Sequence, residues 1–224
     1  MSKIMKIGLL SLGATVVSAA ASAQEYRWDM TMIGVTPELH AQTGKTGASS
    51  PENNVVIGIF DGRADRNHSD FEGRVTNIDN LYSGSYTKFS LHGTHVSGTA
   101  GAGDNGTGIA GVAPDAKINS YAVFDDTTWR ATDLGRKAFQ HAQAAGVDVV
   151  NMSYGPSVGG GDAFLTGELN IFDDYQNDMV LVRAAGNSGV SVKAEYYAGD
   201  ASANLGHLLI VGSVDSNKKP AFPE

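Results

Sequence analysis

The chain has 224 residues, of which 42% are apolar and 18% are charged, so it is long enough for one α/β domain with a large core and too apolar for a disordered protein. Its 24 acidic and 16 basic residues give a net charge of −8, and because no Lys/Arg cluster could neutralise phosphates we expect no nucleic-acid partner. The chain contains no cysteine, and a domain with a core of this size needs no disulfides.

Residues 1–23 have the pattern of a bacterial export signal. Two lysines precede an apolar run at 7–20 that is too short to span a membrane comfortably. Ala-Ser-Ala at 21–23 is a small-residue cleavage signature, so we expect the mature chain to begin at Gln24. The alternative is a buried N-terminal helix. We therefore expect an exported protein that is secreted, periplasmic or displayed on the bacterial cell surface.

The polar, turn-rich residues 24–53 indicate an N-terminal extension, followed by one domain over 54–224. An unbroken apolar run predicts a strand at 55–60, and further mainly apolar stretches predict strands at 118–124, 147–152, 179–182 and 208–211. Helices are predicted between them, one capped by Thr132 or Asp133 and ending at Gly146, and one over 164–175. This alternation favours an α/β fold with a mostly parallel central sheet between two helical layers.

Sites in such sheets lie beyond the carboxyl ends of the strands. Asp61 directly follows the first strand, where a desolvated carboxylate can orient a histidine. By itself, Asp before Gly is more typical of a turn. Asn187 follows the strand at 179–182 and could donate to an oxyanion, or could simply be a turn residue between glycines.

His92 opens the run His-Gly-Thr-His-Val-Ser-Gly-Thr at 92–99, and three interpretations compete for it. His92 and His95 have the spacing of a helical metal-ligand pair, but no third ligand sits at a recognised zinc spacing. His95 could be a core histidine. Alternatively, His92 is the general base of a nucleophilic system.

Together these segments resemble the subtilisin-like serine protease family, or subtilases. The aspartate motif of that family is followed by His-x-Asp, which is matched here by Asp61 with His68 and Asp70. Its histidine motif is matched nearly in full by 92–99. Further segments resemble those of the family in the same order over about residues 53–219, at 108–114, 151–155, 184–187 and 211–215.

The resemblance implies a three-layer subtilisin-like fold and peptide-bond hydrolysis by an Asp-His-Ser triad. His92 would take the serine proton, Asp61 would hold the imidazole, and Asn187 would stabilise the oxyanion. A polypeptide substrate would pair as an added strand with one segment, and a second segment would wall the specificity pocket. These segments are Ser153, Tyr154 and Gly155, and Ala184, Ala185 and Gly186, respectively.

The nucleophile motif of the family, Gly-Thr-Ser-x-Ala, does not occur in these 224 residues. We therefore expect the fold to be incomplete at its C-terminus and the chain to be inactive alone. One interpretation is the N-terminal part of an exported endopeptidase, and another is a split protease completed by a polypeptide that bears the serine. A third is a non-catalytic secreted peptide-binding module. Some exported relatives are anchored through an outer-membrane barrel, so an autotransporter-type protease is a further expectation.

Two other features depart from, or add to, the family pattern. Gly62 and Arg63 replace a hydroxyl residue and a glycine, and the Arg63 cation could either favour the ionised Asp61 or capture it. No cofactor is required, but Asp70 and Asn105, in the loop 104–107, match the position of a stabilising calcium site of the family. The equal alternative there is an Asx-rich turn.

Overall fold

The computed structural model describes residues 27–43, 55–79, 81, 88–123, 131–154, 162–187, 206 and 208–220. Within these ranges the strands form one six-stranded sheet in which every neighbouring pair is parallel, with the order β2-β3-β1-β4-β5-β6. The strands are β1 Val56–Asp61, β2 Val75–Ile78, β3 Lys117–Ala122, β4 Val149–Met152, β5 Val180–Ala184 and β6 Leu208–Val211. The predicted α/β class and parallel sheet are confirmed.

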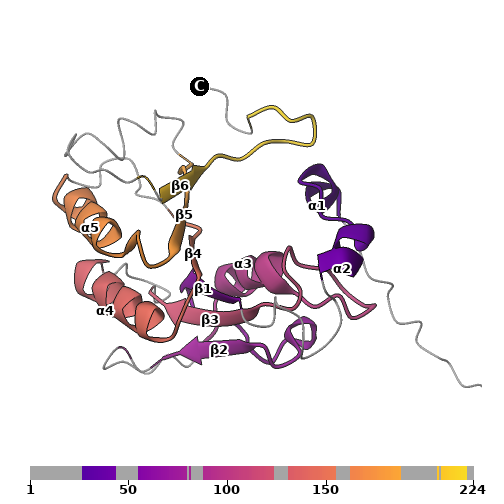
Figure 1. Cartoon of the computed structure of the whole chain (residues 1–224), viewed down its shortest axis with the longest axis horizontal. Helices are drawn as coiled ribbons and strands as arrows, with labels where there is room; N and C mark the ends of the chain where they lie inside the picture. The colour runs from indigo at the N-terminus through magenta and orange to yellow at the C-terminus, as the bar shows by residue number, and fades with distance from the viewer. Residues whose placement is uncertain are drawn as a thin grey trace, which may run out of the picture.

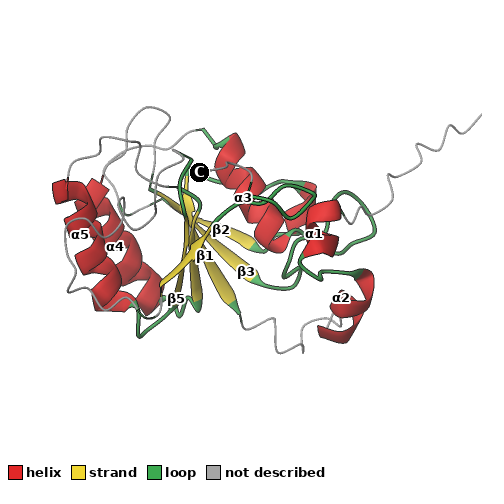
Figure 2. Ribbon diagram, turned by 90° about the horizontal axis from the view of Figure 1, so that it is seen from above, coloured by secondary structure: helices red, strands yellow, loops and turns green. Residues whose placement is uncertain are grey.

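Helices cover both faces of the sheet, which gives three layers (Figures 1 and 2). α4 (Ala131–Ala144) and α5 (Asp162–Tyr175) lie side by side on one face, and α3 (Leu91–Gly101) lies on the other. A short 3₁₀ turn, η3 (Ser69–Phe71), precedes β2, and α1 (Trp28–Met32) and α2 (Pro37–Thr43) precede the sheet in the chain. None of the helices in the described part of the chain has both the length and the apolar character that a bilayer crossing requires.

The core has two parts, one on each face. Under α4 and α5, the ring of Phe139 contacts those of Phe60, Phe172 and Tyr175, with centroids 4.8, 6.0 and 5.4 Å away. Full burial of one such side chain contributes about 1.5–3 kcal/mol. A smaller cluster on the α3 face is built from Ile59, Phe71, Val75 and Ile118 with Ala64. The unbroken apolar runs of the sequence are explained by this coverage of the sheet from both sides.

Helix α3 was not predicted, because its sequence is rich in glycine and has no apolar stripe. These glycines are what allows the helix to lie close to the sheet and to the following loop. A Cβ on Gly101 would lie 3.0 Å from Ile118 Cδ1, and one on Gly111 would lie 2.7 Å from the Gly101 nitrogen. Helix α3 packs against the sheet through glycines rather than through a stripe of large apolar side chains. Its sequence therefore lacks the periodicity from which a helix is predicted.

The other differences concern helix ends and short elements. α4 begins at Ala131, so Thr132 and Asp133 lie inside the helix rather than capping it. Its predicted end is correct: Gly146 has φ +66°, and the Val147 amide donates to the Ala142 carbonyl at 3.0 Å, as in a helix closed by a left-handed glycine. Strand β2, with only four residues, was not predicted.

The N-terminal extension has its own helices and contacts the domain. Met30, Val35 and His40 are at most 4% exposed. The His40 Nε2 atom lies 3.3 Å from the Val112 carbonyl oxygen, and its Nδ1 atom lies 3.8 Å from Asp104. The predicted boundary at 53/54 falls in residues outside the described ranges.

Strand β6 lies at one end of the described sheet. Leu209 and Val211 are 54% and 53% exposed.

Candidate active site

Asp61 is the last residue of β1, and the fold buries its carboxylate at the carboxyl edge of the sheet. It is 2% exposed, and its Oδ1 atom accepts a hydrogen bond from the Gly62 amide at 2.7 Å. Burial raises the pKa of the Asp61 carboxyl above its ordinary value of 3.8, although hydrogen bonds from His92 and the Gly62 amide partly oppose this. The carboxylate is therefore desolvated, which strengthens its interaction with a cationic neighbour.

His92, the second residue of α3, faces this carboxylate. Its Nδ1 atom lies 2.9 and 2.8 Å from the two Asp61 oxygens, while its side chain is 63% exposed. Because a carboxylate only accepts hydrogen bonds, Nδ1 carries the proton and the lone pair of the neutral ring lies on Nε2. An oriented imidazole with a free Nε2 lone pair can accept a proton from a hydroxyl.

The first turn of α3 is fixed by a network around Ser90, its N-cap residue. Ser90 Oγ accepts from the Gly93 amide at 3.2 Å, and the Ser90 amide donates to the Arg63 carbonyl at 2.6 Å. Thr94 Oγ1 donates to the Ser90 carbonyl at 2.7 Å and accepts from the Asp65 amide at 2.9 Å. The segment after β1 and the start of α3 are thus joined on both sides of the Asp61–His92 pair.

The second position of the histidine motif, Gly93, has no room for a side chain. A Cβ at this position would run into the Gly62 carbonyl and would lie 3.3 Å from Asp61 Oδ1. Only a glycine lets the helix approach the strand closely enough for the His92 ring to reach the carboxylate.

Arg63 does not contact Asp61. Its Nε atom donates to both carboxylate oxygens of Asp79, at 3.0 and 3.1 Å. Burial raises the pKa of Asp61, and Arg63 does not contribute to this shift. The expectation that the Arg63 cation would either favour or capture the Asp61 carboxylate is therefore wrong.

The described residues of the two predicted substrate segments, together with Asn187, lie at the same edge of the sheet, at or after the ends of strands β4 and β5. Because β1, β4 and β5 are parallel neighbours, their carboxyl ends meet there. Ser153 and Tyr154 are half-buried, Asn187 is exposed, and Gly155 lies outside the described residues.

Two contacts define the ends of these strands. Ser153 Oγ accepts from the Asn151 amide group at 2.9 Å. Ala184 ends β5, and the Ala185 amide donates to the Val211 carbonyl at 2.9 Å, which ties this segment to β6. Gly186 has φ +97°, a conformation that favours glycine and turns the chain before Asn187.

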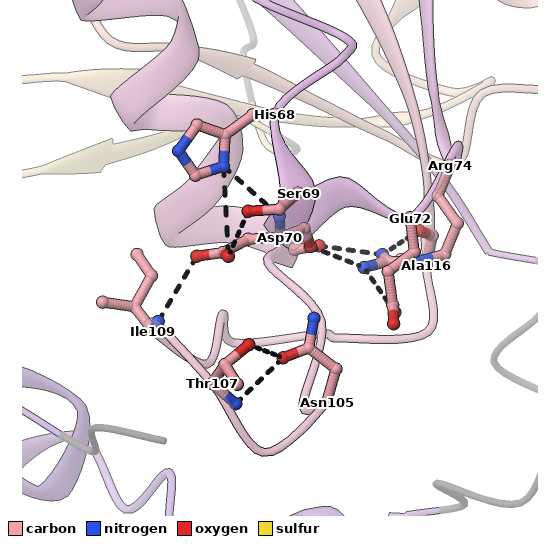
Figure 3. Close-up of polar contacts among 10 residues, drawn as sticks. His68, Ser69, Asp70, Glu72, Arg74, Asn105, Thr107, Ile109 and Ala116 are labelled. Atoms are coloured by element: carbon pink, nitrogen blue, oxygen red, sulfur yellow. Dashed lines mark hydrogen bonds and ion pairs between the residues drawn. The ribbon is translucent and has the colours of Figure 1, made fainter. Parts of the chain in front are cut away.

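A second predicted site lies beside η3 (Figure 3). Asp70 is 8% exposed, and its Oδ2 atom lies 3.4 Å from the Ile109 amide nitrogen. A Cβ on Gly108, which has φ +63°, would lie 2.6 Å from the same carboxylate. The carboxylate therefore faces the loop that carries Asn105.

Asn105 contacts its own turn. Its side-chain oxygen accepts from the Thr107 amide at 3.1 Å and from Thr107 Oγ1 at 3.0 Å (Figure 3). No group of three or more His, Cys, Asp or Glu side chains with metal-binding placement exists in the described ranges. Calcium takes oxygen ligands, and the Asp70 carboxylate and the Asn105 side-chain oxygen are groups of that kind.

The sequence prediction did not include several residues that build this region. Ser90 could have been found because a serine directly before the first helical residue, here Leu91, is a helix start signal. Arg183, an arginine directly after the apolar run at 179–182, was an unused signal of a buried cation. The pairing of Arg63 with Asp79 had no signal in the sequence.

Comparison with known proteins identifies the class. Residues 52–222 match the family model described as Subtilase family. The chain is 34% identical to Subtilisin DY of Bacillus licheniformis over 170 residues, which is 75% of this chain and 59% of that protein. It is 31% identical to Fervidolysin of Fervidobacterium pennivorans over 219 residues, which is 89% of this chain and 28% of that relative.

A solved structure agrees with the sequence comparison. The crystal structure of the psychrophilic subtilisin-like protease Apa1 from Pseudoalteromonas sp. AS-11 superimposes with a TM-score of 0.65 at 29% identity, over 90% of this chain and 43% of Apa1. This chain belongs to the subtilase family, and it spans less than two thirds of the length of each of these relatives.

Proposed function

We propose that this chain supplies the Asp–His part of an exported serine-type endopeptidase. The observation that carries the proposal is the pairing of the exposed His92 ring, through Nδ1, with the buried Asp61 carboxylate at 2.8 Å. Nε2 would accept the proton of a serine hydroxyl, and Asp61 would stabilise the imidazolium that forms. The serine would be supplied by a segment outside these 224 residues, either on the same polypeptide or on another.

The reaction would proceed by acyl transfer. The serine oxygen would bond to the substrate carbonyl carbon, and the Asn187 amide group would donate to the resulting oxyanion. His92 would then pass its proton to the leaving amine as the peptide C–N bond breaks. Water would then take the place of the amine. His92 would accept a proton from the water as its oxygen bonds to the acyl carbon, and would return that proton to the serine oxygen as the ester bond breaks.

The substrate would be a polypeptide bound in extended form. Ser153, Tyr154 and Gly155 would pair with it through their backbone, as an added strand. Ala184, Ala185 and Gly186 would wall the pocket for one substrate side chain. The position of both segments after neighbouring parallel strands supports this arrangement.

The alternative function is a secreted peptide-binding module without catalysis. It drew support from Gly62 and Arg63, which depart from the family motif. Since Arg63 pairs with Asp79 and leaves the Asp61–His92 contact intact, this departure does not favour the alternative.

Export and calcium are parts of the same proposal. The export signal at 1–23 lies outside the described residues, and the subtilisin relatives are consistent with it. Calcium would be held by Asp70, Asn105 and carbonyl groups of their loop, where it would stabilise the fold rather than take part in hydrolysis.

The first test is to sequence the gene beyond the codon for Glu224. If a Gly-Thr-Ser-x-Ala segment follows, the extended polypeptide is expressed and its hydrolysis of a peptide substrate is measured. His92→Ala should lower kcat/KM by at least about 10²-fold. His95→Ala is the matched control, because His95 is an exposed histidine one turn further along α3, and it should retain activity. The absence of a serine-bearing segment in the gene and in any co-purified chain, or full activity of His92→Ala, would refute the proposal.

A further inference from the structure

Arg183 places a cation inside the apolar layer under α5. It is 1% exposed, and it lies on the same face of β5 as the buried Leu181, which packs in the core under α4 and α5. A buried guanidinium is retained in a fold only when its charge is paired. The partners of Arg183 therefore indicate what it does.

Three side chains of the described residues lie around the guanidinium. Nη1 lies 2.6 Å from Glu168 Oε1 of α5, which neutralises the charge. The central carbon lies 5.2 Å from the centre of the Tyr154 ring and 5.4 Å from that of Phe172. These are cation–π distances, and the attraction is strongest where water is excluded.

The position of this cluster connects it to the proposed substrate edge. Arg183 pairs with Met152 across β4 and β5, and it directly precedes the segment 184–187. Tyr154 belongs to the other substrate segment, and its half-buried ring packs against the main core. The Arg183 side chain thus contacts Tyr154 of one proposed substrate segment. The Arg183 backbone continues directly into the other segment, 184–186.

We propose that Arg183, neutralised by Glu168, is a positioning residue that holds Tyr154, and with it the backbone of Ser153 and Tyr154, in the geometry that binds an extended peptide. The inference rests on the proposed function, since it assigns Arg183 to the same groove. Because Glu168 neutralises the cation, Arg183 acts through Tyr154 and does not attract acidic substrate side chains. A purely structural role would affect stability alone.

The test separates stability from peptide binding. In the full chain, Arg183→Met combined with Glu168→Leu removes both charges of this ion pair together, so the fold should survive. Thermal melting measures stability, anisotropy of dye-labelled Ala-Ala-Ala-Phe amide measures binding, and 3-fluorotyrosine at position 154 reports on the ring by ¹⁹F NMR. We expect a melting temperature within a few degrees of the wild type, affinity at least about tenfold weaker, and a shifted ¹⁹F resonance.

A double-mutant cycle tests whether the effect passes through the ring. In a Tyr154→Leu background, the same two substitutions should change peptide affinity by less than about twofold, since the coupling partner is already gone. If the Arg183/Glu168 variant melts far below the wild type, Arg183→Lys replaces it. Lysine keeps the charge but lacks the planar group that faces the two rings, so the same loss of affinity is expected.

The outcomes distinguish the two proposals. A wild-type chain that binds peptide, with a stable variant that binds equally well and has an unchanged ¹⁹F resonance, overturns the positioning role alone. A full additional loss of affinity in the Tyr154→Leu background overturns it as well. A wild-type chain that binds no peptide overturns the proposed groove, and the role of Arg183 with it.

Discussion

Ser90 fills the space beside Gly62. A Cβ on Gly62 would lie 2.7 Å from Ser90 Oγ, the same hydroxyl oxygen that accepts the Gly93 amide and caps α3. The glycine that departs from the family motif at position 62 is therefore matched to the residue that fixes the helix carrying His92.

Restoring a hydroxyl at position 62 should consequently harm this protein. Gly62→Ser would displace Ser90 from its capping position, and overpacking of this kind costs about 1–3 kcal/mol, with about 1 kcal/mol more if the cap is lost. Chemical denaturation measures the loss in the free energy of unfolding. Gly212→Ser is the control, because a Cβ there meets nothing within 4 Å. Equal stability of the two variants would contradict the prediction.

The buried Asp61 carboxyl should destabilise the folded chain at neutral pH. Its pKa is raised above 3.8, chiefly by burial, so the folded state favours the protonated form. The stability it contributes is complete below the unfolded pKa and is lost as pH rises through the folded pKa. Asp61→Asn should therefore be at least as stable as the wild type at pH 7, and this advantage should disappear near pH 3.

Asp215 is the control, because its pKa is shifted in the opposite direction to that of Asp61. Backbone hydrogen bonds, chiefly from the Lys219 amide, lower the pKa of this exposed carboxyl. Its contribution is present above the unfolded pKa and is lost as pH falls through the folded one, so Asp215→Asn should lose stability at pH 7. Thermal melts of both variants at pH 3 and pH 7 make the comparison, and a loss of stability at pH 7 for Asp61→Asn would refute the sign.

Calcium should raise the melting temperature of the full chain if Asp70 and Asn105 hold it. At a calcium concentration about 100 times Kd, the stabilisation is about 2.7 kcal/mol. Asp70→Asn should abolish the shift, whereas Asp174→Asn, which removes an exposed carboxylate on α5, should not. If neither added calcium nor a chelator changes the melting temperature, the segment is an Asx-rich turn and not a calcium site.

Arg74 should be one of the most important surface-facing cations for stability. Its Nη1 atom donates to the carbonyls of Gly101 and Ala116 at 2.8 and 3.1 Å, and Nη2 donates to that of Asp70 at 3.3 Å (Figure 3). Because hydrogen bonds to a charged group contribute about 1.5–3 kcal/mol each, Arg74→Met should lower the free energy of unfolding by several kcal/mol.

The matched control for Arg74 is Arg136. Its ion pair with Asp174 joins side chains that are 44% and 52% exposed, and exposed pairs contribute about 0–1 kcal/mol. Arg136→Met should therefore change stability little. Urea denaturation measures the free energy of unfolding of both variants. Similar losses would show that Arg74 does not hold together the segments that contain Asp70, Gly101 and Ala116.

Much of the fold could be predicted from local patterns. The run at 55–60 has no polar residue, and only a strand covered on both faces suits it, as β1 does. Gly146 was correctly predicted to end α4 because a left-handed residue after a helix is usually glycine. Helix α3 escaped prediction because it approaches the sheet through glycines.

The sequence by itself determined five of the six described strands, the family motifs, and the pairing of Asp61 with His92 as the candidate centre. Only the tertiary structure decided which partner each polar side chain took. Arg63 turns to Asp79, Ser90 fills the space beside Gly62, and Arg183 lies between Glu168 and Tyr154. The physical reason is that charge pairing and close packing depend on distances between residues far apart in the chain, which a local pattern does not contain.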